Sequence, residues 1–174
     1  MSQEYPRPSV NFRSPAALKW LDAISESNSI LSAILAVIHP QLYEAGWQTI
    51  EHLRGTSEID PKGVLSQWAS VFSSISIISN CYTPPHWDNG SRYNWYDILA
   101  TSGSYWNCEL KLLGLGIALE YGPGTVVGLA GKVLEHEVCN FKGDRVCYGY
   151  FIRNNVHDWA NVPASNWMYA KEYE

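Results

Sequence analysis

The spacing of the apolar residues changes near residue 71, and this change constrains the fold more than any other feature of the sequence. Before it, apolar side chains recur at helical spacing in three stretches, which begin after Ser14, span 29–38 and span 40–54. After it, apolar residues alternate with small polar ones or form short β-branched and aromatic runs bounded by Gly or Asp. The pattern therefore predicts helices first and then roughly six to eight short strands.

This order of elements predicts an α+β chain in which helices pack against a β-sandwich or a jelly roll. The proline-rich residues 1–15 are predicted to form an N-terminal arm. Residues 16–174 are predicted to form one domain, because a chain of 174 residues has the ordinary length of one. Within it we expect a helical part at 16–70, a β core at 71–157 and a C-terminal tail at 158–174.

Composition and charge narrow the class of protein. With 46% hydrophobic and only 17% charged residues, the chain is not of the disordered, collagen-like or coiled-coil type. Its formal net charge is −5 and its basic residues are scattered, so no broad nucleic-acid footprint is visible, although a single groove can still be positive. The polar start, the absence of long apolar runs and four spaced cysteines predict an intracellular protein with reduced thiols and no membrane association.

The motif His86-Trp87-Asp88 follows the rigid pair Pro84-Pro85. In an extended segment residues i and i+2 point to the same face, so His86 and Asp88 can converge on a metal ion. The pattern alone is weak, because five histidines and seventeen acidic residues give roughly half a chance pair at this spacing. By itself the pair is more typical of a capping aspartate beside a surface histidine.

Features further along the chain strengthen the metal interpretation. His136 lies at the end of the strand-like stretch 125–133, and Arg145 is expected to open another strand after the turn 142–144. Two histidines and a carboxylate from adjacent strands form a facial triad that leaves three positions open on Fe(II). A keto acid would take two of these positions and O₂ the third. The planar fork of an arginine would hold the distal carboxylate of the keto acid.

A connected series of short motifs runs through the second half of the chain. It consists of His86-x-Asp88, Trp95-Tyr96-Asp97-Ile98-Leu99, Leu115-Gly116-Ile117, Tyr121-x-Pro123-Gly124-Thr125-Val126-Val127, His136, and Gly143-Asp144-Arg145-Val146-Cys147-x-x-Tyr150-Phe151-x-Arg153-x-Asn155-Val156-His157. In this order the series resembles the fungal branch of the TET/JBP family of Fe(II)- and 2-oxoglutarate-dependent dioxygenases. The resemblance covers roughly residues 71–157. It implies a double-stranded β-helix, or jelly-roll, core with the N-terminal helices packed on it.

The resemblance also implies an iron site and a cosubstrate site. Its Fe(II) ligands, which are also its catalytic residues, would be His86, Asp88 and His136. Arg145 would bind the distal carboxylate of 2-oxoglutarate, with Cys147 beside it. Relatives often carry a basic residue where this chain has Trp87, and another where it has Cys81. The cation missing at Cys81 bears on how the proximal carboxylate of the keto acid is held.

The substrate implied by the resemblance is a methylated base flipped out of a nucleic acid. Phe151 would stack on this base, and Arg153 and Ser91 would contact it. We expect 5-methylcytosine in DNA, with N6-methyladenine or a methylated RNA base as variants of the same chemistry. The other reactant would be O₂. The resemblance alone suggests a nuclear location, and we expect a monomer.

Two other functions agree with the same residues. A 2-oxoglutarate oxygenase acting on a small molecule or a protein would keep both cofactors, and the acidic balance and the residues at Cys81 and Trp87 favour it. A non-catalytic nucleic-acid-binding relative is the other alternative. The intact metal-ligand set and Arg145 weigh against that reading.

Overall fold

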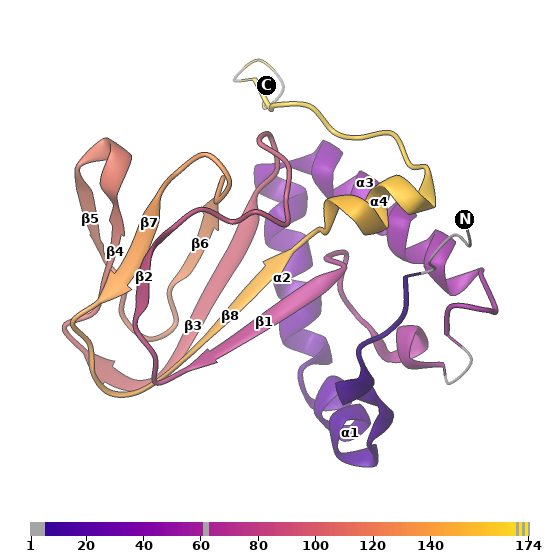
Figure 1. Cartoon of the computed structure of the whole chain (residues 1–174), viewed down its shortest axis with the longest axis horizontal. Coiled ribbons are helices and arrows are strands. Elements are labelled where there is room, and N and C mark those ends of the chain that lie inside the picture. The colour runs from indigo at the N-terminus through magenta and orange to yellow at the C-terminus, as the bar shows by residue number, and fades with distance from the viewer. Residues whose placement is uncertain (1–5, 61–62, 170, 172, 174) are drawn as a thin grey trace. The chain divides into compact units, whose positions relative to one another are not determined.

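The computed structural model describes residues 6–60, 63–169, 171 and 173 (Figure 1). The chain divides into two compact units, which are described separately. One unit comprises Met1–Ser73 and Arg153–Glu174, and the other comprises Ser74–Ile152. Whether the two units act as the one domain expected for residues 16–174 stays a prediction.

The first unit is helical. Its α-helices are α1 (Pro15–Ala23), α2 (Ser25–Ile38), α3 (Pro40–Arg54) and α4 (Asn154–Ala160), and its 3₁₀-helices are η1 (Val10–Arg13) and η2 (Val64–Gln67). The hydroxyl of Ser14 caps α1 by accepting the N–H of Ala17 at 3.2 Å. Nδ1 of His39 caps α3 in the same way by accepting the N–H of Leu42 at 3.2 Å. These caps, each followed by a proline in the first turn, place both helix starts where the sequence signals them.

Two boundaries differ from those expected, and the predicted arm contains a short helix. Residues 1–5 of the predicted arm lie outside the described residues, and the rest of the arm includes η1. The first helix begins at Pro15, inside the predicted arm. The β core predicted to reach residue 157 ends earlier, because residues 154–160 form α4. Within α4, His157 and Ala160 are buried three residues apart, on one helical face, and Nδ1 of His157 lies 2.9 Å from the hydroxyl oxygen of Thr49.

Among the described residues, the second unit consists of two four-stranded antiparallel sheets. Their strand orders are β1-β8-β3-β6 and β2-β7-β4-β5. The elements are β1 (Ser74–Ser79), β2 (Thr83–His86), β3 (Asp97–Trp106), β4 (Glu109–Leu112), η3 (Leu113–Leu115), β5 (Ile117–Glu120), β6 (Val126–Leu129), β7 (His136–Cys139) and β8 (Lys142–Phe151). The α+β class and the jelly-roll core are thus confirmed, while the packing of the helices on that core stays a prediction.

The core of this unit lies between the two sheets. Tyr105, Leu129 and Cys147 come from the larger sheet, and Leu110 and Val138 come from the smaller one. All five are buried in one apolar cluster, so the sheets pack face to face. Polar side chains that enter this layer are therefore removed from water.

Two strands near the expected site differ from the sequence expectation. His136 opens β7 instead of ending a strand that begins at residue 125. Arg145 lies within β8, because the expected turn at 142–144 is part of that strand. Gly143 has φ = +101°, and a Cβ there would meet the carbonyl oxygen of Ser104 at 2.3 Å. The glycine lets two strands approach closely where its sequence context suggests a turn.

Strand β2 was also not expected, because Pro84 and Pro85 suggest a rigid connection. It is an edge strand of its sheet, where missing N–H donors are tolerated. In the described part of the chain, no single helix is long and apolar enough to cross a membrane. Helices α1 and α2 reach that length and composition only when counted together across a bend of 52°, which is weak evidence for a span.

Candidate active site

The structure brings His86, Asp88 and His136 together. Strands β2 and β7 pair antiparallel with His86 directly opposite His136, and the two imidazole rings lie 4.2 Å apart between centroids. Nε2 of His86 is 3.8 Å from Oδ1 of Asp88, and Nε2 of His136 is 3.6 Å from Oδ2. One nitrogen or oxygen atom of each residue lies within 4.8 Å of the other two, so this metal cluster (His86, Asp88 and His136) is able to hold one metal ion.

Both imidazoles are oriented by the carbonyl two residues before them. Nδ1 of His86 lies 2.8 Å from the oxygen of Pro84, and Nδ1 of His136 lies 2.9 Å from the oxygen of Leu134. A carbonyl oxygen can only accept, so each Nδ1 carries a proton, and in the neutral imidazole each Nε2 then presents its lone pair. The Nε2–carboxylate distances exceed those of a hydrogen bond, so the three groups surround a point instead of bonding to one another. This donor set fits a divalent transition metal.

Gly131 supports the carboxylate of Asp88 from two directions. Its carbonyl accepts the backbone N–H of Asp88 at 3.0 Å. A Cβ on Gly131 would lie 2.3 Å from Oδ2 of Asp88 and 2.8 Å from Oδ2 of Asp97. Only a glycine leaves room for both carboxyl groups here.

Asp97, the first residue of β3, is a buried acid beside the metal cluster for which the sequence analysis assigned no role. Burial raises the pKa of Asp97 well above its ordinary value, and the charge of Asp88 raises it further. The nearby hydroxyl of Ser91 lowers this pKa. Its sequence signals were its place in the motif Trp95–Leu99 and its position just before the apolar Ile98 and Leu99. The side chain of Ser91 is buried against Asp97, and its expected contact with a base stays a prediction.

Arg145 lies in the core layer with only 1% of its surface exposed. Its guanidinium carbon is 5.9 Å from the ring centroid of Tyr105, 5.1 Å from that of Tyr121 and 5.6 Å from that of Phe141. Among the described residues, its Nε and Nη1 have no hydrogen-bond partner. A buried cation with unsatisfied donors is costly unless an anion pairs with it. This arginine pocket (Tyr105, Tyr121, Phe141 and Arg145) therefore fits a carboxylate ligand bound through the planar fork.

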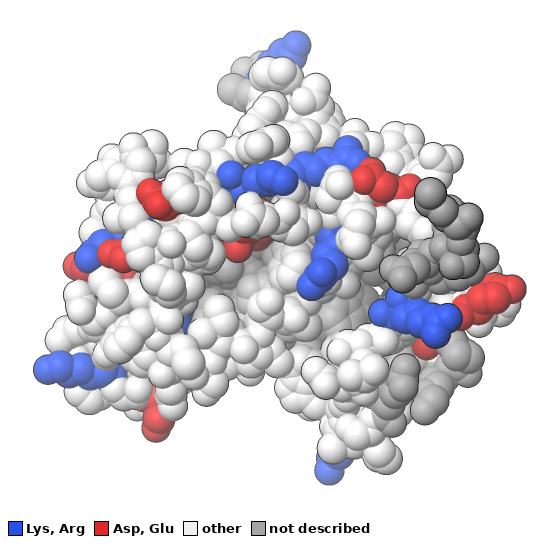
Figure 2. Space-filling view, in the orientation of Figure 1, with Lys and Arg blue, Asp and Glu red and all other residues white. Residues whose placement is uncertain are grey.

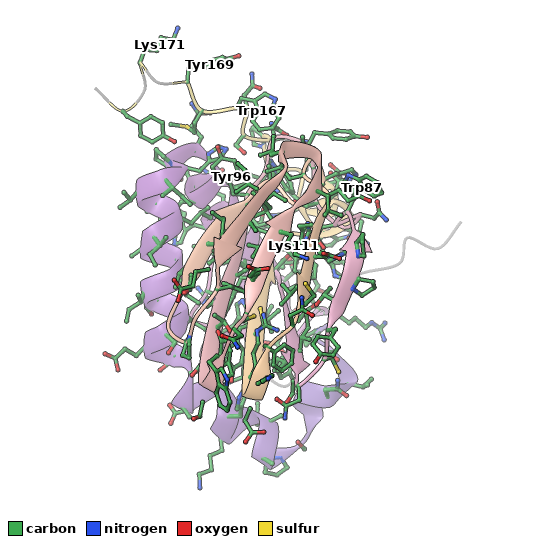
Figure 3. The ribbon with its side chains drawn as sticks, turned by 90° about the vertical axis from the view of Figure 1, so that its left-hand side faces the viewer. Trp87, Tyr96, Lys111, Trp167, Tyr169 and Lys171 are labelled. Carbon is green, nitrogen blue, oxygen red and sulfur yellow. The ribbon has the colours of Figure 1, made fainter. Side chains whose placement is uncertain are left out.

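Cys147 lies two residues after Arg145 on β8, so both side chains point to the same face of the strand. Its Sγ is 3.5 Å from the hydroxyl oxygen of Tyr121. Burial, followed by the neighbouring Cys147, raises the pKa of Tyr121. Cys81 and Trp87 are both exposed, and Trp87 lies just beyond the end of β2 (Figure 3).

The two remaining residues expected to bind substrate belong to different units. Phe151 ends β8, and its ring faces Gly90 in the loop after Asp88, where a glycine Cβ would meet Cε2 at 3.6 Å. Arg153 belongs to the helical unit, where its backbone N–H donates to the hydroxyl of Ser73 at 2.9 Å. The contact of Arg153 with a base stays a prediction.

Comparisons with known proteins identify the family and the fold of the chain. Residues 4–154 match the Tet_JBP family, described as the oxygenase domain of the 2OGFeDO superfamily. Among solved structures, NgTET1 in complex with 5mC DNA is similar, with a TM-score of 0.65 and 18% sequence identity. The match covers 95% of this chain and 61% of the NgTET1 chain, and at this identity it shows a shared fold. No curated protein matches the chain.

Proposed function

We propose that this chain, which belongs to the Tet_JBP family of Fe(II)- and 2-oxoglutarate-dependent oxygenases, oxidises the methyl group of 5-methylcytosine in DNA. The observation that carries the proposal is the cluster of His86, Asp88 and His136, whose two Nε2 atoms and carboxylate surround one point. The similar NgTET1 structure contains 5mC DNA, which supports the choice of substrate.

The three clustered side chains would hold Fe(II). Two imidazoles and one carboxylate are the ligand set of non-haem iron oxygenases, and they leave positions open for other ligands. The carbonyls of Pro84 and Leu134 orient both rings, which would keep the two Nε2 atoms available to the ion. Gly131 holds Asp88 by accepting its N–H and by leaving space beside its carboxylate.

Arg145 would bind the distal carboxylate of 2-oxoglutarate. Its unsatisfied Nε and Nη1 donors are the groups that a carboxylate pairs with, and the aromatic rings around it exclude water and so strengthen the attraction. When bound, Fe(II) and 2-oxoglutarate would activate O₂ as the oxidant: one oxygen atom would enter succinate as the keto acid loses CO₂, and the other would convert a methyl C–H bond into C–OH. The residues of the chain bind and orient these groups.

Phe151 would stack on the flipped base. Its ring is partly exposed and lies against Gly90, in the loop that begins directly after the metal ligand Asp88. Enzymes that act on a base inside a duplex read the extruded base by stacking and by hydrogen bonds to its edge. The placement of Phe151 supports the first of these contacts, and Ser91 and Arg153 are proposed for the second.

The test is succinate release and base oxidation by the purified, iron-loaded chain with 2-oxoglutarate. Duplexes would carry 5-methylcytosine, N6-methyladenine or no methyl group, and His86→Ala would serve as the inactive control. We expect oxidised cytosine and coupled succinate only with the 5-methylcytosine duplex. Equal succinate release with every duplex, without base oxidation, would overturn the DNA substrate and favour a small molecule or protein. If the chain shows no turnover and binds no iron, the proposal that it is an oxygenase is overturned.

A further inference from the structure

An exposed aromatic side chain lies on the loop that follows the metal ligand Asp88. Tyr93 is 66% exposed, although the residues on either side of it are partly or fully buried. Residues 92–95 form a turn, in which the N–H of Trp95 donates to the carbonyl of Arg92 at 3.2 Å. Trp95 is buried and its ring carries the guanidinium of Arg92 at 4.9 Å. The buried Trp95 therefore fixes the turn to the protein, while the Tyr93 ring points into solvent.

A lysine lies over this ring. Nζ of Lys132 is 5.0 Å from the ring centroid of Tyr93, within the range of a cation–π contact. Lys132 directly follows Gly131, whose carbonyl accepts the N–H of Asp88. Its own turn is closed by the N–H of Val133, which donates to the carbonyl of Ala130 at 2.9 Å. Tyr93 thus lies on the loop that follows Asp88, and Lys132 lies on the turn that is hydrogen-bonded to Asp88 through Gly131.

We propose that Tyr93 and Lys132 bind the nucleic-acid strand that carries the substrate base. The inference rests on the proposed function, and it adds the contact that holds the strand beside the iron. Tyr93 would stack on a neighbouring base, and Lys132 would pair with a phosphate. A stacked aromatic with an adjacent cation is the chemistry by which proteins hold single or unpaired nucleotides without reading their sequence.

The charge of the molecule favours a local contact of this kind. The chain carries a formal net charge of −5, so its overall field does not attract DNA. On the face shown in Figure 2, acidic and basic side chains are scattered among uncharged ones. Attraction for a phosphate must then come from individual basic side chains placed beside the site, and Lys132 is placed in that way.

The larger sheet, β1-β8-β3-β6, carries a second pair of an exposed aromatic residue and a lysine, which serves as a matched control. Trp106 ends β3 and is 58% exposed, and Lys142 is its cross-strand partner on β8. Asp97, which lies beside the metal cluster, begins β3. Trp106 is nine residues further along this strand, so the Trp106–Lys142 pair lies about 30 Å from Asp97. It has the same exposed aromatic and lysine, but it lies at the end of the strand remote from the metal cluster.

The experiment measures the affinity of the full chain for a fluorescently labelled duplex carrying one 5-methylcytosine, as a function of salt. We expect Tyr93→Ala and Lys132→Ala each to weaken binding roughly tenfold. Lys132→Ala should also reduce the slope of log affinity against log salt by about one. Trp106→Ala and Lys142→Ala should change the affinity by less than about twofold. Thermal unfolding of each variant checks that it is folded.

Each outcome separates this inference from the proposed function. If Tyr93→Ala and Trp106→Ala weaken binding equally, or if neither weakens it, the contact is overturned, even if the chain oxidises 5-methylcytosine. The contact is also overturned if the wild-type chain binds no duplex. If binding depends on Tyr93 and Lys132 but no methylated base is oxidised, the contact stands and the proposed substrate chemistry fails.

Discussion

The metal cluster and the arginine pocket belong to the same β unit but differ in exposure to solvent. The side chains of His86 and Asp88 are 35% and 36% exposed and only His136 is buried, whereas Arg145 is almost completely buried among three aromatic rings. A metal that receives O₂ and a bulky substrate needs an open side. A cation that selects one carboxylate gains from exclusion of water, because the attraction is stronger at low dielectric. The proposed metal site and the proposed cosubstrate site therefore differ in their exposure to water.

Replacing Arg145 sharpens this comparison most, because stability and binding should change in opposite directions. Arg145→Met removes a buried cation with unsatisfied donors, which should leave the chain without 2-oxoglutarate equally stable or more stable by about 1–4 kcal/mol. It should also weaken 2-oxoglutarate binding about 100-fold, since a charge-assisted hydrogen-bonded pair is lost. Thermal unfolding and calorimetric titration of the iron-loaded chain under anaerobic conditions measure both effects.

The control for this change is Lys142→Met, at an exposed position of the same strand, which should alter neither quantity. A lower melting temperature for Arg145→Met would mean that the guanidinium stabilises the pocket through its aromatic contacts. The pocket would then be a structural element, and the contrast with the metal cluster would disappear.

Gly131→Ala tests whether the space beside the Asp88 carboxylate is needed for metal binding. The new methyl group would need the position 2.3 Å from Oδ2 of Asp88, so the carboxylate must move. We expect Fe(II) affinity to fall about 10–100-fold, the range seen when groups that support metal ligands are changed. Titration with Co(II), followed by its visible absorption, measures the loss. Gly122→Ala, where a Cβ meets no atom within 4 Å, should bind the metal normally. Equal affinity in both variants would contradict this role of Gly131.

The sequence predicts the metal ligands better than it predicts the residues that support them. His86 and Asp88 are two residues apart, so their convergence follows from local geometry, whereas the approach of His136 depends on the pairing of β2 with β7. The role of Arg145 came from family resemblance. Its burial follows from the packing of two sheets, which no local pattern records. Gly131 could not be identified, because its importance depends on two carboxyl groups distant in the sequence.

The same reason explains the errors in the elements. Long helices with caps, such as α3, were placed correctly because capping and periodicity are local signals. The turn expected at 142–144 was wrong, because Gly143 serves the close approach of β3 and β8 and does not end a strand. The short helix α4 follows a strand directly, and its buried face is set by contacts such as that of His157 with Thr49.

Asp97→Asn tests whether the buried acid beside the metal cluster carries a stability cost. Its pKa is raised in the folded state by burial and by Asp88, so folding is favoured while Asp97 is protonated. That advantage is full below the ordinary value of 3.8 and is lost as the pH rises from there toward the folded pKa. An asparagine does not titrate. The metal-free variant should therefore become more stable than the wild type as the pH rises, by on the order of 1–3 kcal/mol at neutral pH.

Urea unfolding of the metal-free chains between pH 4 and pH 8 measures this difference. The wild-type curve is the reference, and the gap between the two curves should widen as the pH rises. Parallel curves would show that Asp97 carries no such cost. The metal cluster and the arginine pocket would then differ in more than exposure, since only the pocket would hold a costly ionisable group.

Cys147→Ser should have the smallest effect, and it defines how far the arginine pocket extends. Cys147 shares a strand face with Arg145 and belongs to the apolar core cluster, and its Sγ lies 3.5 Å from the hydroxyl oxygen of Tyr121. A serine oxygen can bond to the same hydroxyl, so we expect less than about 1 kcal/mol of change in stability and less than roughly fivefold in 2-oxoglutarate affinity. Cys139→Ser, on the partly exposed β7, is the control for the loss of a thiol. A loss of affinity as large as that of Arg145→Met would place Cys147 in direct contact with the cosubstrate. The pocket would then select its ligand by shape as well as by charge.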